Sequence, residues 1–136
     1  MKTIELDESR LPAILDAIPD GRPVVMLNLL KFNHLANYSA ESDDENCPGR
    51  EAYDERYLKP AKSHISAIGG TVIYDGDVCT EVIGEKASYW NRIIIVSYPS
   101  ITEFMAMVSS PEYQAIRLHR AAALEDSRLV ATIENA

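Results

Sequence analysis

Hydrophobic and polar positions follow one another along the chain in blocks that predict strands separated by helices. Residues 23–32 (PVVMLNLLKF) are nearly all apolar, which predicts a strand buried on both faces. A second β-rich segment covers Tyr89–Tyr98, and Pro99 ends it because proline has no N–H for a ladder. One long or two short strands are expected in Thr71–Glu85, and a last strand is expected at Arg128–Glu134.

Apolar residues at helical spacing predict helices in three segments of the chain. These segments are Asp7–Ile18, Arg50–Ile68 and Ile101–Glu125. The last segment is expected to hold two helices, because each of two serines has the features of a helix start. Ser100 opens a capping box, and Ser110 precedes a proline at the helical position where proline is tolerated.

The order of the predicted elements, without the first helix, is β-α-β-β-α-β. This order is the ferredoxin-like α+β pattern, an antiparallel sheet with two helices on one face. We expect a single domain over residues 1–136, with a helical extension at 1–22 and a long acidic loop at 33–49. The apolar strands predict a homodimer in which two sheets pack face to face, and a monomer with a partly solvated sheet is the alternative.

Charge and composition argue against several classes of partner. The chain has 13 Lys and Arg against 21 Asp and Glu, a net charge of −8, which disfavours nucleic acid and anionic membranes. The apolar runs are too short to span a membrane, and the first ten residues lack the apolar core of a secretory signal. Cys47 and Cys79 are far apart in the sequence, so we expect reduced thiols and a cytoplasmic location.

Several short motifs, taken in their order along the chain, resemble one known family. They are VVMLNLLKF at Val24–Phe32, GREAYDERY at Gly49–Tyr57, Gly69-Gly70, Trp90–Tyr98, Pro99-Ser100, SPEY at Ser110–Tyr113, and Arg120 before the last strand. The chain resembles the domain of unknown function numbered thirteen-thirty, in the dimeric α+β barrel superfamily. The resemblance implies the ferredoxin-like fold and the dimer. It implies no reaction, because superfamily relatives include cofactor-free monooxygenases, haem-degrading enzymes and lactone isomerases.

The helix predicted at Arg50–Ile68 carries the most suggestive group of side chains. Tyr53, Tyr57 and His64 fall on one helical face, which the neighbouring apolar residues mark as the inward face. Histidine titrates near neutral pH and can act as a general base, with the two phenols as pocket walls. The alternative is a packed helix in which the buried polar tips only find hydrogen-bond partners.

Four further residues are candidates for the same pocket. Asn28 interrupts an apolar strand, where it can donate to a ligand carbonyl or pair with backbone. Arg92 follows Trp90 on one strand face, where it can clamp a carboxylate beside a stacking platform or form a salt bridge. Arg120 lies on an inward helix face and can hold an acidic ligand or pair with a carboxylate. His119 lies off that face and is expected to face solvent.

The sequence holds no nucleotide, flavin or phosphate motif and no spacing typical of metal ligands, so we expect no cofactor and no metal. The favoured hypothesis is a pocket between sheet and helices that binds a small carbonyl-bearing or aromatic acid. The protein would then be a cofactor-free enzyme, with His64 as base and Asn28 as oxyanion donor, or a non-catalytic ligand-binding or sensing dimer. A structural dimer without a pocket is the remaining alternative.

Overall fold

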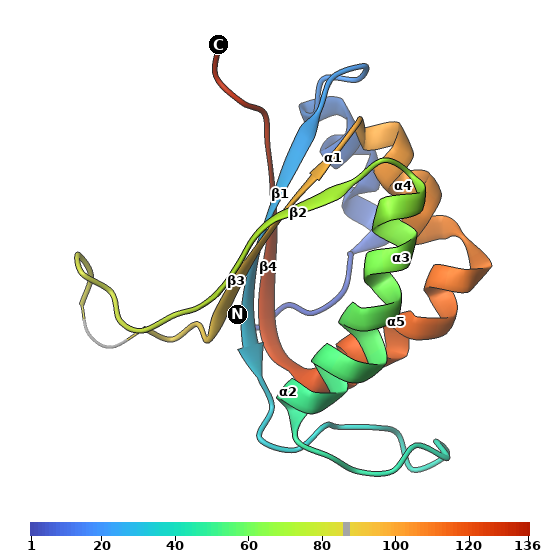
Figure 1. The fold of residues 1–136 in the computed structure, drawn as a ribbon, viewed down its shortest axis with the longest axis vertical. Helices are drawn as coiled ribbons and strands as arrows, with labels where there is room; N and C mark the ends of the chain where they lie inside the picture. The colour runs from blue at the N-terminus through green and yellow to red at the C-terminus, as the bar shows by residue number, and fades with distance from the viewer. Residues whose placement is uncertain (86–87) are drawn as a thin grey trace.

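Four antiparallel strands form the sheet, in the order β2-β3-β1-β4 (Figure 1). The structure is a computed structural model that describes residues 1–85 and 88–136. The strands are β1 Val24–Phe32, β2 Thr71–Asp77, β3 Arg92–Tyr98 and β4 Leu124–Thr132. With helices between β1 and β2 and between β3 and β4, this order confirms the ferredoxin-like α+β fold.

The helices pack on one face of this sheet (Figure 1). They are η1 Glu8–Arg10, α1 Leu11–Ala17, α2 Gly49–Glu51, η2 Ala52–Leu58, α3 Lys59–Ala67, α4 Ile101–Ser109 and α5 Pro111–Ala123. The oxygen of Ser100 accepts from the Glu103 amide, and that of Ser110 accepts from the Tyr113 amide, each at 3.2 Å. These bonds confirm the two predicted helix starts, because each satisfies an amide that the first helical turn leaves free.

Side chains alternate along β3 between a covered and an open face. Arg92 and every second residue after it, through Tyr98, are buried beneath the helices, whereas Ile93 and Ile95 are half-buried on the other face. Strand β1 behaves in the same way: Val24, Met26 and Leu30 are buried, and Val25, Leu27 and Leu29 are half-buried. The prediction that both faces of this strand are buried is therefore wrong for the single chain, because the helices cover only one face.

Two predicted strand boundaries were wrong. Strand β4 begins at Leu124, directly after α5, because Leu124 already has an extended backbone and pairs with Phe32 at a bulge. Strand β2 ends at Asp77 and β3 begins only at Arg92, so Trp90 lies outside the sheet ladder.

The segment 33–48 forms the predicted loop, and it is tied to the end of α5. The Asn33 amide donates to the Ala123 carbonyl at 2.9 Å, and the Asn37 amide donates to the Ala122 carbonyl at 2.7 Å. Gly49 starts the next helix at a place where a side chain would collide with the Asn33 carbonyl. Across residues 1–85 and 88–136, no helix is long and apolar enough to cross a membrane.

Candidate functional site

Four tyrosines and one arginine gather beneath the helices on the covered face of the sheet. This phenol–arginine cluster consists of Tyr53 and Tyr57 from η2, Tyr98 from β3, and Tyr113 and Arg120 from α5. The four tyrosines are all buried, and Arg120 is half-buried. The Tyr53 and Tyr57 ring centroids lie 5.2 Å apart, and the hydroxyls of Tyr57 and Tyr113 lie 2.6 Å apart. So many polar tips in one core are unusual, because buried polar groups need partners.

Burial and the positive charge of Arg120 both act on the pKa values of the buried tyrosines. Burial raises the pKa of Tyr53 to about 12 and raises the pKa of Tyr57 and Tyr98 as well. The positive charge of Arg120 opposes this rise in pKa at all three phenols. The phenols therefore remain protonated at neutral pH and can act as O–H donors.

Arg120 enters this cluster without a carboxylate partner. Its Nη1 donates to the main-chain carbonyl of Ile4 at 2.7 Å. Among the residues that the structure describes, no Asp or Glu lies within ion-pair distance of the guanidinium. The cation thus has N–H donors that are available to another acceptor, since arginine has five of them.

Two phenol hydroxyls in the cluster also lack a protein partner. Within the described ranges 1–85 and 88–136, neither Tyr53 nor Tyr98 forms a side-chain hydrogen bond. Every fully enclosed side-chain nitrogen or oxygen in these ranges does have a partner. The Tyr53 and Tyr98 hydroxyls are therefore not fully enclosed by packed atoms, and each can donate to a water molecule or a ligand oxygen.

A π-helical turn presents Tyr53 and Tyr57 to the cluster. The helix predicted as regular is a π-helix over Ala52–Leu58, with the Lys59 amide bonded to the Asp54 carbonyl five residues earlier. Pro60 gives a physical reason for the widened turn, because it has no N–H for the Arg56 carbonyl and its ring would clash there. Such turns are rare and frequently occur at functional sites, so the proline inside the predicted helix was the signal that sequence reasoning missed.

The two proposed catalytic residues lie on the covered side of the sheet but do not bond each other. Asn28 pairs with Ile94 in the ladder, and its Nδ2 donates to the Ile94 carbonyl at 3.2 Å. His64 is half-buried on α3, with its ring centroid 6.5 Å from that of Tyr113. His64 therefore lies beside the cluster. Asn28 bonds a backbone carbonyl, which was the alternative to a ligand-binding role in the sequence analysis.

Arg92 lies at the start of β3 and is engaged by two carboxylates. It donates to Asp54 at 2.6 Å and twice to Asp75 at 2.7 Å, and its guanidinium lies 5.8 Å from the Tyr53 ring centre. The hydrogen bond from Arg92 lowers the pKa of Asp75. This is the salt-bridge arrangement that the sequence left open, and it fixes Tyr53 from one side.

Trp90 lies away from the phenol–arginine cluster. Its ring packs edge-on against Tyr89 at 5.1 Å, and the guanidinium of Arg128 lies 5.3 Å from its centre. Arg128 pairs with Leu29 in the ladder, on the open face of the sheet. Trp90 therefore stacks with Arg128 rather than with Arg92.

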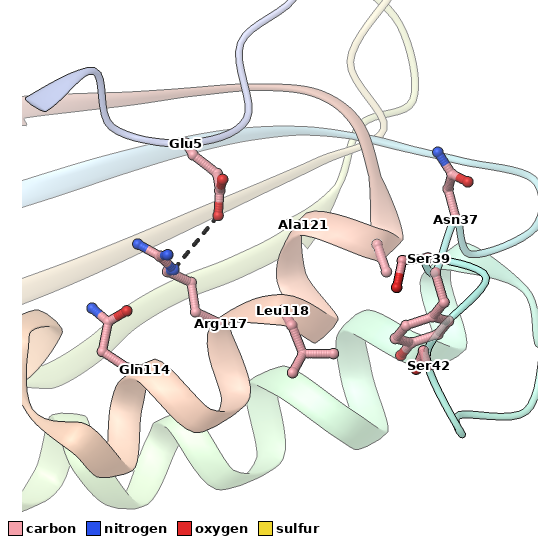
Figure 2. A pocket seen from close by; sticks show the side chains of 10 residues that line it. Glu5, Asn37, Ser39, Ser42, Gln114, Arg117, Leu118 and Ala121 are labelled. Carbon is pink, nitrogen blue, oxygen red and sulfur yellow. Dashed lines mark ion pairs between the residues drawn. The ribbon is translucent and has the colours of Figure 1, made fainter.

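A polar hollow of about 310 Å³ lies on the outer side of α5 (Figure 2). Figure 2 shows Glu5 and Arg117 at one end, joined by an ion pair of 3.5 Å, and Asn37, Ser39 and Ser42 at the other end. Next to it, the Tyr38 hydroxyl lies 2.7 Å from Nδ1 of His119. His119 is half-buried, so the prediction that it faces solvent is wrong, because the loop over 33–48 folds back onto α5.

Sequence reasoning missed Tyr98 and Tyr113 as members of the cluster. Both carried a signal: Tyr98 continues the buried alternation of Arg92, and Tyr113 stands seven residues before Arg120, two turns along one helix face. Across residues 1–85 and 88–136, no group of three or more His, Cys, Asp or Glu side chains could hold a metal ion.

Comparisons with solved structures identify the same fold in other proteins. A protein of unknown function from Rhodopseudomonas palustris superposes with a TM-score of 0.86 at 27% identity, covering 100% of this chain and 99% of that chain. A hydroxynitrile lyase from Passiflora edulis superposes with a TM-score of 0.59 at 12% identity, covering 85% and 95%. A dabb family protein with a ferredoxin-like fold from Mesorhizobium loti gives a TM-score of 0.52 at 13% identity, covering 84% and 98%. The last two likenesses show the fold alone.

Comparison with curated proteins gives no match. The family described as "Domain of unknown function (DUF1330)" matches residues 46–133, which hold the whole helix of Tyr53 and Tyr57, β2, β3, both later helices and β4. The match therefore includes every member of the phenol–arginine cluster, and the chain belongs to the DUF1330 family.

Proposed function

We propose that the phenol–arginine cluster binds a small organic anion, of the class of carbonyl-bearing or aromatic carboxylic acids. One observation carries the proposal: Arg120 faces buried phenols without a carboxylate partner among the described residues, and the hydroxyls of Tyr53 and Tyr98 have no partner there either. A cation in such surroundings is costly unless an anion or strong acceptors meet it.

The hydrogen-bonding inventory of the cluster selects the chemistry of the ligand. The guanidinium offers only donors, and protonated phenols offer their O–H groups. A carboxylate has two acceptor oxygens and can take two parallel N–H bonds from an arginine. An amine ligand is disfavoured, because the cluster itself contains no carboxylate. The rings of Tyr53 and Tyr57, 5.2 Å apart, supply an apolar wall for the rest of the ligand.

An enzymatic function is the second candidate, and the Tyr57–Tyr113 pair favours it. Two phenols 2.6 Å apart beside a cation form a donor array that suits a developing oxyanion. His64, on the adjacent helix, is the candidate base, and Asn28 is the candidate oxyanion donor predicted from the sequence. The Asn28 amide spends one N–H on the Ile94 carbonyl. The Tyr57–Tyr113 pair likewise spends one O–H on its mutual bond, so the pair and Asn28 each keep one donor hydrogen for an oxyanion.

Arg92 and Trp90 take indirect roles in this proposal. Arg92 is already held by Asp54 and Asp75, so we propose that it positions Tyr53 rather than the ligand. Trp90, which stacks with Arg128, is proposed as part of the homodimer surface. The sequence also predicted a ligand-binding role for both residues.

We also propose that the protein acts as a homodimer that pairs the open faces of two sheets. Support comes from the apolar residues on that face, which are Val25, Leu27, Leu29, Ile93 and Ile95. Covering such a face removes apolar surface from water. A cytoplasmic location is supported by the free thiols of Cys47 and Cys79, since reducing compartments keep thiols unpaired.

The binding proposal is tested with sodium benzoate and sodium pyruvate as probes, by titration calorimetry and two-dimensional NMR. We expect Arg120→Met to weaken binding of the probe that binds by tenfold or more, and Arg120→Lys to weaken it less. Arg10→Met is the matched control, because Arg10 is an exposed arginine on η1 that lies outside both the cluster and the hollow. A control that weakens binding as much as Arg120→Met, or no binding of either probe, would overturn the proposal.

The enzymatic candidate has its own test, in which pyruvate in D₂O is followed by NMR for exchange of its methyl protons. A base beside an oxyanion site should accelerate that exchange, and His64→Gln should remove roughly 10²-fold or more of the acceleration. If pyruvate binds to the wild-type protein but its methyl protons exchange no faster than in buffer, the protein binds pyruvate without abstracting a proton from it.

A further inference from the structure

The first five residues lie as a strap across the edge between β4 and α5. Thr3 donates its amide to Asp126 at 2.8 Å and its hydroxyl to the Ser127 carbonyl at 2.6 Å. The Ser127 amide and hydroxyl both donate to the Thr3 carbonyl, and Arg128 donates to the Met1 carbonyl. The strap is therefore firmly bonded to β4 over Met1–Thr3.

The next two residues of the strap, Ile4 and Glu5, are held by fewer contacts. The Ile4 carbonyl accepts from Arg120, and its half-buried side chain packs against the core. Among residues 1–85 and 88–136, Glu5 forms a single ion pair, of 3.5 Å with Arg117, in which both side chains are about half exposed. Exposed ion pairs contribute little stability, so this part of the strap can open more easily than Met1–Thr3.

The strap touches both the polar hollow and the phenol–arginine cluster. Glu5 and Arg117 form one end of the hollow (Figure 2), and the adjacent Ile4 contacts Arg120 on the inner side. Arg117 and Arg120 are three positions apart, so the two arginines are neighbours on successive turns of α5. Displacement of Ile4 and Glu5 would free the Arg120 N–H group that the Ile4 carbonyl now holds, on the side of α5 next to the hollow.

We propose that Ile4 and Glu5 form a gate for the anion site, hinged at Thr3, and that the ligand enters through the hollow. This inference rests on the proposed function. In the closed state, the Ile4 carbonyl accepts one Arg120 N–H bond in place of a ligand oxygen. The ligand takes that bond when the gate opens, and a polar tail beyond its acid group would lie among the hydroxyl and amide groups of the hollow.

The gate is tested without a ligand, by labelling the protein with phenylglyoxal and mapping modified arginines by mass spectrometry. Glu5→Gln removes the exposed ion pair and should speed labelling of Arg120 by about two- to fivefold. Ile4→Ala removes the packing of the gate and should speed it by roughly tenfold or more. Glu112→Gln is the matched control, an exposed acid on α5 without an ion pair among the described residues, and should leave the rate unchanged.

The buried thiol of Cys47 distinguishes opening of the gate from general loosening of the fold. Its alkylation by iodoacetamide, measured in the same samples, should not change in Ile4→Ala or Glu5→Gln, because Cys47 lies in the separate loop over 33–48. Labelling of Arg120 that does not rise in either variant, or that rises only in step with Cys47, would overturn the gate.

A second arm of the experiment separates the gate from the proposed function. If benzoate or pyruvate binds, it should protect Arg120 from labelling, and Ile4→Ala should raise the association rate constant. A probe that binds with the same rate constant in both gate variants overturns the gate and leaves the anion site. Failure of both probes to bind, with faster labelling of Arg120 in the gate variants, overturns the proposed function and leaves the mobile strap.

Discussion

The hydroxyl oxygens of Tyr57 and Tyr113 lie 2.6 Å apart in the buried interior, although the two residues are 56 positions apart in the sequence. Their rings meet edge to face, with centroids 6.1 Å apart. The pair joins the π-helical turn of η2 to α5, the two helical elements that carry most of the phenol–arginine cluster. Burial raises the pKa of Tyr57 well above its usual value, so this hydroxyl stays protonated at neutral pH.

Removal of both hydroxyls from this pair should cost less than the two single removals added together. Tyr113→Phe leaves the Tyr57 hydroxyl buried without its partner, which should lower the free energy of unfolding by about 1–3 kcal/mol. The double variant Tyr57→Phe/Tyr113→Phe should cost less than the sum of the single variants, because no orphaned hydroxyl remains. Urea denaturation of the four proteins measures this coupling.

Tyr74→Phe is the control for these substitutions, since Tyr74 is exposed on the sheet edge. Its free energy of unfolding should stay within about 0.5 kcal/mol of the wild type. Single variants whose costs simply add in the double variant would show that the two hydroxyls do not depend on each other.

The Arg92 network should make stability depend on acid. The hydrogen bond from Arg92 lowers the folded-state pKa of Asp75, so its stabilisation is complete above the unfolded value of about 3.9 and is lost as pH falls through the lowered value. Arg92→Met should cost roughly 2–3 kcal/mol at pH 7 and should flatten the loss of stability below about pH 4.

Arg50→Met is the matched control, because Arg50 also pairs with two aspartates but is half exposed. It should cost less than about 1 kcal/mol and keep the acid dependence of the wild type. Urea midpoints measured between pH 3 and 7 check both variants. Equal acid dependence in wild type and Arg92→Met would contradict the role of Arg92.

The fold could be predicted because local signals agreed with one another. The apolar strands, the two serine helix starts and the glycines after α3 all pointed to the same β-α-β-β-α-β order. The predicted ends of elements were wrong where a contact distant in sequence, and not a local sequence pattern, sets the end. Strand β4 starts four residues early because Leu124 pairs with Phe32, a contact that no local pattern reveals.

The candidate site was harder to predict, since its geometry depends on partners distant in sequence. Periodicity correctly placed Tyr53 and Tyr57 among buried residues. It could not reveal that Arg92 meets Asp54 and Asp75, or that Asn28 bonds the Ile94 carbonyl. The ion pairs of Arg92 and the hydrogen bond of Asn28 depend on the register of the strands and on the position of the π-helical turn. Both are set only when the chain folds.

Self-association should follow from the open sheet face. We expect sedimentation velocity at micromolar concentration to show a dimer of the 15.1 kDa chain, burying at least about 1,200 Å² in total. Leu27→Glu places a charge on the open face and should give the monomer. Leu15→Glu, on an exposed position of α1, should leave the dimer intact. Only a 15.1 kDa species in the wild type would refute the dimer.

The Tyr38–His119 bond should make the attachment of the loop over 33–48 depend on pH. Burial, followed by the charge of Arg56, lowers the pKa of His119, against an opposing effect of Asp44. Neutral His119 is therefore favoured in the folded loop, and the attachment should weaken as pH falls below the unfolded value of about 6.5.

Amide hydrogen exchange between pH 5 and 8, corrected for intrinsic rates, measures this effect. The Asn37 amide, which donates to the Ala122 carbonyl, should lose protection at low pH in the wild type. It should lose none in His119→Gln, which cannot titrate. The exposed stretch 43–46 should exchange fast at every pH. The same pH dependence at Asn37 in both proteins would show that His119 does not control the loop.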